Sequence, residues 1–485
     1  MTAANRQNRQ NRPVGPPATH RPRLPLWVAI VAGGVITSIS LGVRSTFGIL
    51  LEPIADGLDT QTGSIAVAIA VQNLLWGFSQ PLAGAASDRF GAARTLAAGG
   101  ALYVLSMLLL AQANSPGMVL ISGGFITGVA IGAASFAVVL STVGKMSPPE
   151  KRSLNLGIVS AVGSLGQFVL VPVAQWHLDR NDWTDTLVLL GIIAAAIIVV
   201  APLISNVELE REPDGSAGGA AEPTRTLRQE LRRAAHSRSY LMLNGAFFVC
   251  GFHVTFIGIF LPGYAEDGGL STSTASTGLA LIGLFNVAGS LIVGVLGQRM
   301  RFTTVLAWIY GLRAVVIAIY VIVPLTAAST IAFSMAIGLL WLATVPMTSA
   351  IVTQQFGPAH AGALFGIVFL SHQIGSFVGA FLGGELVDAT DSYLAMWWIG
   401  VALGVIAMVF HLLIDESPVP EPPAPGEGGL PLVPAGVGIT MAAVGIAAAL
   451  SVATAPPADA ADGSGTRTAI PGFCALPPPV VDRGP

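Results

Sequence analysis

Long apolar runs alternate with short polar segments along most of this 485-residue chain. A membrane-spanning helix needs about 20 mostly apolar residues, and windows of that length predict twelve such helices. Six of them lie at 26–50, 64–86, 94–113, 117–142, 154–176 and 184–205. The other six lie at 240–262, 275–296, 303–323, 328–350, 361–387 and 393–414. The pattern therefore predicts an all-α membrane protein with twelve transmembrane helices.

Three polar segments flank or separate these helices. Residues 1–25 are polar and basic, and we interpret them as a disordered cytoplasmic N-terminal tail. Residues 206–238 combine a Gly/Ala/Pro-rich part with an arginine-rich part, and we interpret them as a cytoplasmic linker. The arginine-rich part is either an amphipathic helix on anionic lipid or a solvated basic segment. In the Pro/Ala/Gly-rich C-terminal tail, 415–485, the apolar stretch 430–454 is either an extra span or a disordered segment.

Composition and charge distribution also indicate an integral membrane protein. Hydrophobic residues make up 53% of the chain and charged residues 10%, whereas a soluble domain carries about 25% charged residues. With the N-terminus placed inside, the inner segments hold 18 of the 23 Lys and Arg residues, and the outer loops hold one, Arg180. This distribution follows the positive-inside rule, so we expect a bacterial cell (inner) membrane with the N-terminus and the central linker in the cytoplasm. The net charge of −3 gives no reason to expect a nucleic-acid partner.

The chain also contains an internal repeat. The segment from Gly84 to Leu96 resembles the segment from Gly294 to Leu306, and the offset is 210 residues. Residues 157–182 resemble residues 366–391 at an offset of 209. We therefore expect two parallel six-helix halves, 26–205 and 239–414. Halves of this kind rock against each other and bind a solute near the bilayer midplane between them.

The loop after the second predicted helix carries a charged motif within the sequence GAASDRFGAAR, formed by Gly84, Asp88, Arg89, Gly91 and Arg94. This loop resembles the signature of the major facilitator superfamily, and the resemblance extends over about residues 26–414. It implies a secondary transporter in which this loop gates the motion of the two halves. Physically, Gly84 allows two helices to approach closely, and Asp88 can meet a helix N-terminus or a cation.

Two further segments resemble the monocarboxylate-transporter-like branch of that superfamily. One is KRSLNLG, from Lys151 to Gly157, and the other is GVRSTFG, from Gly42 to Gly48. The resemblance implies that Arg44 faces the carboxylate of a substrate. We therefore expect secondary active transport of a small organic solute, a monocarboxylate-like anion, by a rocker-switch mechanism of alternating access. The alternative is a multidrug or metabolite efflux transporter with the same fold.

Ionisable and amide side chains within the predicted helices are the candidates for chemistry, because a polar group in lipid is costly. We expect Arg44, Asn73, His253, His372 and Gln373 to bind substrate. Arg44 could instead reach the outer interface or pair with Glu52. A histidine can relay protons near neutral pH, or it can simply bond a neighbouring helix.

Arg313 lies near the middle of the ninth predicted helix. Reaching an interface from there is difficult, so we expect it to pair with a partner on a neighbouring helix. Other function classes lack their motifs: the sequence has no phosphate-cradling Gly-Lys-Ser/Thr loop, no metal-ligand cluster and no nucleophile–base motif. We therefore expect neither an enzyme nor a bound metal or cofactor. The expected partners are a small-molecule substrate, the lipid bilayer, and a coupled proton or counter-anion, with the monomer as the working unit.

Overall fold

The computed structural model describes residues 24–134, 136–204, 225–390 and 392–420. Every regular element within these ranges is a helix. The predicted N-terminal tail up to residue 23, the Gly/Ala/Pro-rich part of the linker and the apolar stretch 430–454 lie outside the described residues.

Twelve membrane-crossing segments follow one another in this part of the chain. Eleven of the described helices are long and apolar enough to cross a bilayer, and the twelfth, α4, has 29 residues. The segments of the first half are α2 (Leu26–Ser45), α4 (Thr62–Phe90), α5 (Ala92–Ala111), α6 to α8 (Pro116–Met146), α9 (Pro149–Leu178), and α10 with η2 (Trp183–Ile204). Those of the second half are α12 (Arg238–Asp267), α13 (Thr272–Leu296), α14 (Phe302–Ile322), α15 with α16 (Ala327–Phe356), α17 (Ala361–Thr390) and α18 (Leu394–Leu413). Each corresponds to one predicted helix, so the predicted fold class is confirmed.

The helices pair in the same way in both halves of the chain. In the first half, α2 packs along α9, α5 along α10, and α4 along α7 (Thr127–Ala133). In the second half, α12 packs along α17, α14 along α18, and α13 along α15 (Ala327–Leu340). These are equivalent helices of the two predicted repeats, as expected for a duplicated transporter fold.

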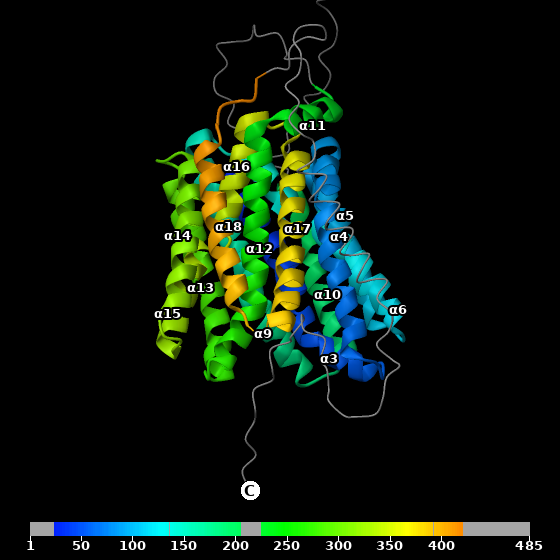
Figure 1. Ribbon diagram of the computed structural model, residues 1–485. Coiled ribbons are helices and arrows are strands. Elements are labelled where there is room, and N and C mark those ends of the chain that lie inside the picture. Colours follow the sequence, from blue (N-terminus) through cyan, green and yellow to red (C-terminus); the bar gives the residue numbers. More distant parts are fainter. Residues whose placement is uncertain (1–23, 135, 205–224, 391, 421–485) are drawn as a thin grey trace, which may run out of the picture.

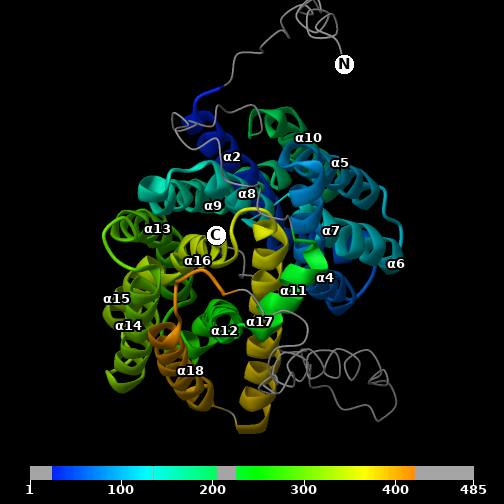
Figure 2. The same cartoon turned by 90° about the horizontal axis from the view of Figure 1, so that it is seen from above.

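Two helix pairs join the halves to each other. α17 packs against α4, and α13 packs against α9. Figure 2 shows both pairs from one end of the molecule. The repeat exchanges α4 with α13 and α9 with α17, so the two contacts are equivalent and the interface between the halves is pseudo-symmetric.

Large apolar side chains cover the outer faces of the peripheral helices. Val199, Trp308, Ile322 and Leu412 each expose more than 60% of their surface. An apolar surface of this kind is unfavourable in water and is satisfied by lipid acyl chains, while the backbone polar groups are bonded within the helices.

A short helix, α11 (Leu227–His236), lies across one end of the bundle (Figure 1). Thr226 begins it with a capping box. The carboxylate of Glu230 accepts hydrogen bonds from Arg225 at 3.3 Å and from Arg233 at 3.0 Å. The Arg233 guanidinium also lies over the ring of Phe356, at the end of α16 (Thr344–Phe356). This arginine-rich part of the predicted linker is therefore helical and contacts the second half.

Candidate functional site

A chain of polar side chains begins at Arg44, near the end of α2. Its Nε and Nη2 donate to Oδ1 of Asn73 in α4, at 3.2 and 2.5 Å. Its Cζ lies 4.9 Å from the centre of the Trp76 ring, which is a cation–π arrangement. Arg44 is half-buried. Within the described part of the chain, neither Glu52 nor another acid forms a salt bridge with it. The guanidinium has more N–H groups than these bonds use, so it can also bind an anion.

The polar chain continues into the second half. Nε2 of Gln373 in α17 donates to the backbone oxygen of Asn73 at 3.3 Å. Oε1 of Gln373 lies 3.0 Å from Nδ1 of His372. Four of the five residues that the sequence suggested for substrate binding therefore form one path, from Arg44 through Asn73 and Gln373 to His372. We call these four residues the polar path; it crosses from one half to the other.

His253, the fifth residue, lies outside the polar path. Its Nε2 is 2.8 Å from the backbone oxygen of Gly400 in α18, and the side chain is 1% exposed. The ring therefore bonds a neighbouring helix of its own half, which is the structural alternative that the sequence left open.

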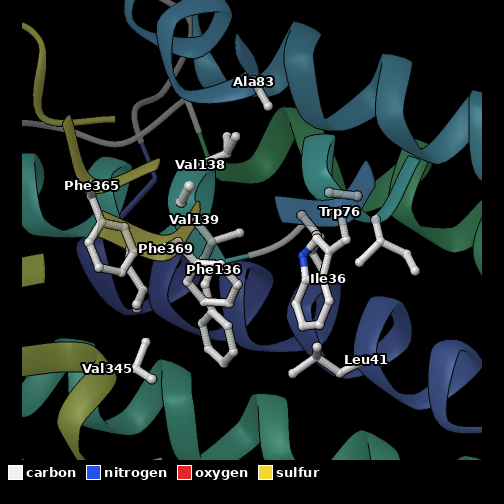
Figure 3. Close-up of a cluster of buried hydrophobic side chains, with 14 of the residues drawn as sticks. Ile36, Leu41, Trp76, Ala83, Phe136, Val138, Val139, Val345, Phe365 and Phe369 are labelled. Carbon is white, nitrogen blue, oxygen red and sulfur yellow. The ribbon is translucent and has the colours of Figure 1, made fainter. Parts of the chain in front are cut away.

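An aromatic layer lies next to the polar path, on the side of the α4–α5 loop. It consists of Trp76 from α4, Phe136 at the start of α8 (Phe136–Met146), and Phe365 and Phe369 from α17. Ring centres lie 5.3 Å apart for Trp76 and Phe369, and 6.3 Å apart for Phe136 and Phe369. Figure 3 shows these rings together with apolar side chains of α2 and α16. Because these four residues are all buried and come from both halves, they close the space between the halves at this level.

Contacts between the halves continue from the aromatic layer to the α4–α5 loop. Gly84 packs so closely on Gly362 that a Cβ atom at Gly84 would lie 2.0 Å from the Gly362 backbone oxygen. One turn further on, the Asp88 carboxylate pairs with Lys145 of α8 and accepts from the backbone N–H groups of Gly362 and Ala363, at 3.4 and 3.0 Å. These N–H groups belong to the first turn of α17, where the helix dipole favours a negative charge. We call these five residues the loop-side latch.

The other motif residues have different positions. Gly91 ends α4 with a φ of 91°, which glycine adopts without strain. The Arg89 guanidinium lies 5.1 Å from the centre of the neighbouring Phe90 ring, and Arg94 is exposed on α5. Gly84 and Asp88 are therefore the motif residues that contact the opposite half.

Arg313 holds a break in the tenth membrane segment. Helix α15 ends at Leu340 and α16 begins at Thr344. Arg313 Nε donates to the backbone oxygen of Leu340 at 3.0 Å, and Nη2 donates to the backbone oxygens of Leu340 and Trp341. Its Nη1 lies 3.6 Å from Sγ of Cys250. The sequence suggested charge pairing for Arg313, and the partners found are carbonyl groups at the negative end of a helix rather than a carboxylate.

A second polar contact joins the halves at this break. Asn286 Nδ2 of α13 donates to Oγ of Ser164 in α9 at 2.9 Å, and Asn286 Oδ1 accepts from the backbone N–H of Leu342 at 2.9 Å. Nearer the loop end, Ser153 Oγ donates to the backbone oxygen of Gly294 at 2.9 Å. The break between α15 and α16 is therefore bonded to α14 by Arg313 and, through Asn286, to the first half.

Several of these residues could not be singled out from the sequence alone. Lys145, one of two lysines in the chain, is in the sequence only one of the 18 cations of the inner segments. Trp76, Ser164 and Asn286 carry no charge that would mark them, and polar residues of this type also serve for packing between membrane helices. No group of three or more His, Cys, Asp or Glu residues suited to a metal ion is found among the residues that the structure describes.

Comparison with known proteins identifies the family. The model of the Major Facilitator Superfamily matches residues 33–380. Monocarboxylate transporter 13 of Bos taurus is 23% identical over 410 residues, covering 82% of this chain and 92% of that protein. The uncharacterised MFS-type transporter YhjX of Escherichia coli (strain K12) is 24% identical over 355 residues, covering 72% and 85%. The crystal structure of the E. coli fucose:proton symporter aligns with a TM-score of 0.63 at 16% identity, covering 81% of this chain and 100% of that one. This chain therefore belongs to the major facilitator superfamily and is a multi-pass membrane transporter of small solutes.

Proposed function

We propose that this protein transports a small monocarboxylate-like anion by alternating access, and that Arg44 binds the carboxylate. The observation that carries the proposal is the position of Arg44: a half-buried cation where the halves meet, without an acidic partner among the described residues. An uncompensated cation within the membrane is unfavourable, and a carboxylate accepts two parallel hydrogen bonds from a guanidinium. The similarity to monocarboxylate transporter 13 supports the same substrate class.

The groups around Arg44 allow reversible binding of an anion. Asn73 orients the guanidinium through a neutral amide oxygen, which a carboxylate outcompetes because its hydrogen bond is charge-assisted. The Trp76 ring covers one side of the cation. An anion at Arg44 would therefore bind next to Asn73 and Gln373, which belong to opposite halves.

The contacts between the halves support a rocking cycle. The aromatic layer and the loop-side latch lie on one side of the polar path, so the protein is closed toward the α4–α5 loop. We propose that this conformation is open toward the opposite, outer end. In the second conformation the latch and the aromatic layer would separate, and the outer ends of α4 and α17 would approach each other.

Uptake into proteoliposomes tests the substrate class. We expect labelled pyruvate and lactate to accumulate with the wild-type protein, whereas a neutral sugar does not. Arg44→Gln should reduce carboxylate uptake at least tenfold, because the loss of a charged hydrogen-bond donor costs about 1.5–3 kcal/mol. Arg44→Lys should recover only part of it, since an ammonium group cannot form the two parallel bonds.

The control for Arg44 is Arg180→Gln. Arg180 is exposed after the end of α9, and its side chain contacts the ring and the backbone oxygen of Trp176, four residues away on the same helix end. Its replacement should leave uptake unchanged. Normal pyruvate uptake by Arg44→Gln would remove Arg44 from the site, and the absence of carboxylate uptake by the wild type would overturn the proposed substrate class.

The proposed orientation places the α4–α5 loop, α11 and residue 299 in the cytoplasm. Gln61 and Arg299 are both exposed and lie at opposite ends of the bundle. In intact bacterial cells, a membrane-impermeant maleimide should label Gln61→Cys, and it should label Arg299→Cys only after the cells are opened. The reverse pattern would contradict the orientation.

A further inference from the structure

A groove lies between α4 and α5 on the outer side of the first half. Its volume is about 680 Å³, and α7 contributes to its lining. Five of the lining residues are alanine or glycine, namely Ala83 and Ala86 of α4, Ala98 and Gly99 of α5, and Ala133 of α7. Because these short side chains do not fill the space between the three helices, the groove stays open. Figure 2 shows the three helices along one edge of the first half.

The groove occupies one face of α4, and the loop-side latch occupies the opposite face. Phe78, Leu82 and Phe90 line the groove at helical spacing and expose 42%, 73% and 54% of their surface. Gly84 and Asp88, on the other face, contact α17. A continuous exposed apolar surface marks contact with a membrane or a partner. The groove therefore opens sideways into the bilayer and not toward the polar path.

The groove is long enough for one acyl chain. Its lining extends along α4 from Leu75 to Phe90, which is about 22 Å at the rise of an α-helix. One leaflet of a bilayer contributes about 15 Å of hydrocarbon. A chain that starts at the α4–α5 loop can therefore lie in the groove over the full depth of its leaflet.

The loop end of this apolar groove is positively charged. Arg94 is the only ionisable residue among those that line the groove, and it is exposed. No hydrogen bond or ion pair of its guanidinium is found in the described part of the chain. Arg94 belongs to the first turn of α5, where the helix dipole also favours a negative charge and Gly91 offers no capping side chain. Arg89 adds a second cation, which lies against the Phe90 ring. This end of the groove therefore favours an anion.

We propose that the groove binds one anionic phospholipid of the leaflet on the α4–α5 loop side. Arg94 binds its phosphate, and one acyl chain lies along α4. A guanidinium donates two parallel hydrogen bonds to a phosphate, and basic pockets between membrane helices bind anionic head groups. A zwitterionic lipid is a weaker ligand, because its own cation competes with Arg94 for the phosphate. The groove adds contact with the chain, which a surface charge alone does not provide.

Native mass spectrometry of the full-length protein in detergent tests the lipid preference. Phosphatidylglycerol and phosphatidylcholine with the same acyl chains are titrated, and the dissociation constant of the first bound lipid is measured. We expect the wild type to bind phosphatidylglycerol at least fivefold more tightly, since one basic residue near an anionic lipid contributes about that factor. Arg94→Gln should lose this preference.

Arg299→Gln is the matched control. Arg299 is exposed at the same end of the bundle and is the repeat equivalent of Arg89, whereas the equivalent of Arg94 is Thr304. The second half therefore lacks a counterpart of the phosphate-binding arginine, and this substitution should leave the lipid preference unchanged. Ala98→Phe keeps Arg94 but places a ring in the groove, so it should weaken phosphatidylglycerol binding several-fold.

Photo-cross-linking locates the bound lipid. A phosphatidylglycerol with a diazirine in its acyl chain should label residues 75–102 of the wild type, and Ala98→Phe should abolish this labelling. Equal affinities for the two lipids, an unchanged preference in Arg94→Gln, or labelling elsewhere would each overturn the proposal. Displacement by glycerol phosphate, which has no acyl chain, would also overturn it, because the site would then bind a soluble phosphate. None of these measurements involves transport, so their result is independent of the proposed substrate.

Discussion

Replacement of Gly84 by alanine is expected to prevent closure at the α4–α5 loop and to reduce transport at least tenfold. A Cβ atom at residue 84 would lie 2.0 Å from the backbone oxygen and 2.2 Å from the backbone carbon of Gly362. Backbone atoms cannot turn aside as a side chain can, so α4 and α17 must separate. Overpacking of this kind costs about 1–3 kcal/mol.

Separation of these helices also removes the latch bonds of Asp88. Its carboxylate accepts from the N–H groups of Gly362 and Ala363 in α17, and hydrogen bonds to charged groups contribute about 1.5–3 kcal/mol each. The overpacking and the two lost hydrogen bonds together cost about 4–9 kcal/mol, enough to move a two-state equilibrium by more than a hundredfold. The protein should therefore populate the conformation that is open toward the α4–α5 loop.

Distance measurements between spin labels would detect this shift. Labels at Lys151 and Arg299 would lie on opposite halves at the loop end, where Gln298 Nε2 donates to the Glu150 backbone oxygen at 3.3 Å. We expect a short distance in the wild type and a longer one in Gly84→Ala. Gly117→Ala is the control, because a Cβ at Gly117 meets no atom within 4 Å. Wild-type distances and wild-type uptake in Gly84→Ala would contradict the role of this contact.

The helices were predictable because lipid imposes a simple requirement on the sequence. Each crossing must be apolar over about 20 residues and must bond its own backbone, and the repeat at an offset of about 210 residues then indicated two halves. The motif also predicted the environment of Asp88, since a carboxylate at a membrane edge needs a cation or a helix N-terminus. The structure provides both, in Lys145 and α17.

The pairing of side chains across the halves was not predictable from one sequence. Arg44, Asn73 and Gln373 are far apart in the chain, and hydropathy does not show which face of a helix meets which neighbour. Asn286 illustrates the difficulty, because a neutral amide in a membrane helix gives no sign that it bonds both Ser164 and the backbone of Leu342. The break at Leu342 was equally hidden, because residues 340–344 continue the apolar run.

Replacement of Arg313 by methionine is expected to destabilise the protein by about 3 kcal/mol. The last carbonyl groups of α15 lack a continuing helix at the break, and Arg313 donates to those of Leu340 and Trp341. An unsatisfied buried carbonyl costs about 1–3 kcal/mol. Methionine replaces the aliphatic part of the arginine side chain and has no donor, so the substitution removes the guanidinium and its hydrogen bonds. Thermal unfolding followed by tryptophan fluorescence should show a midpoint several degrees lower.

The same substitution shows whether the hydrogen bonds of Arg313 to the break contribute more stability than burial of its charge costs. Removing a buried cation also removes its cost of desolvation, so a small change in stability would mean that this cost offsets the lost hydrogen bonds. Arg313→Lys retains the charge but lacks the planar guanidinium that donates to both carbonyl oxygens. Its unfolding midpoint should lie between those of the wild type and Arg313→Met. Arg180→Met controls for the loss of an exposed arginine and should leave the midpoint unchanged. Asn286 bonds both Ser164 of the first half and the backbone of the break, so Arg313→Met should also reduce uptake. If stability falls while uptake per folded protein is unchanged, Arg313 serves folding alone.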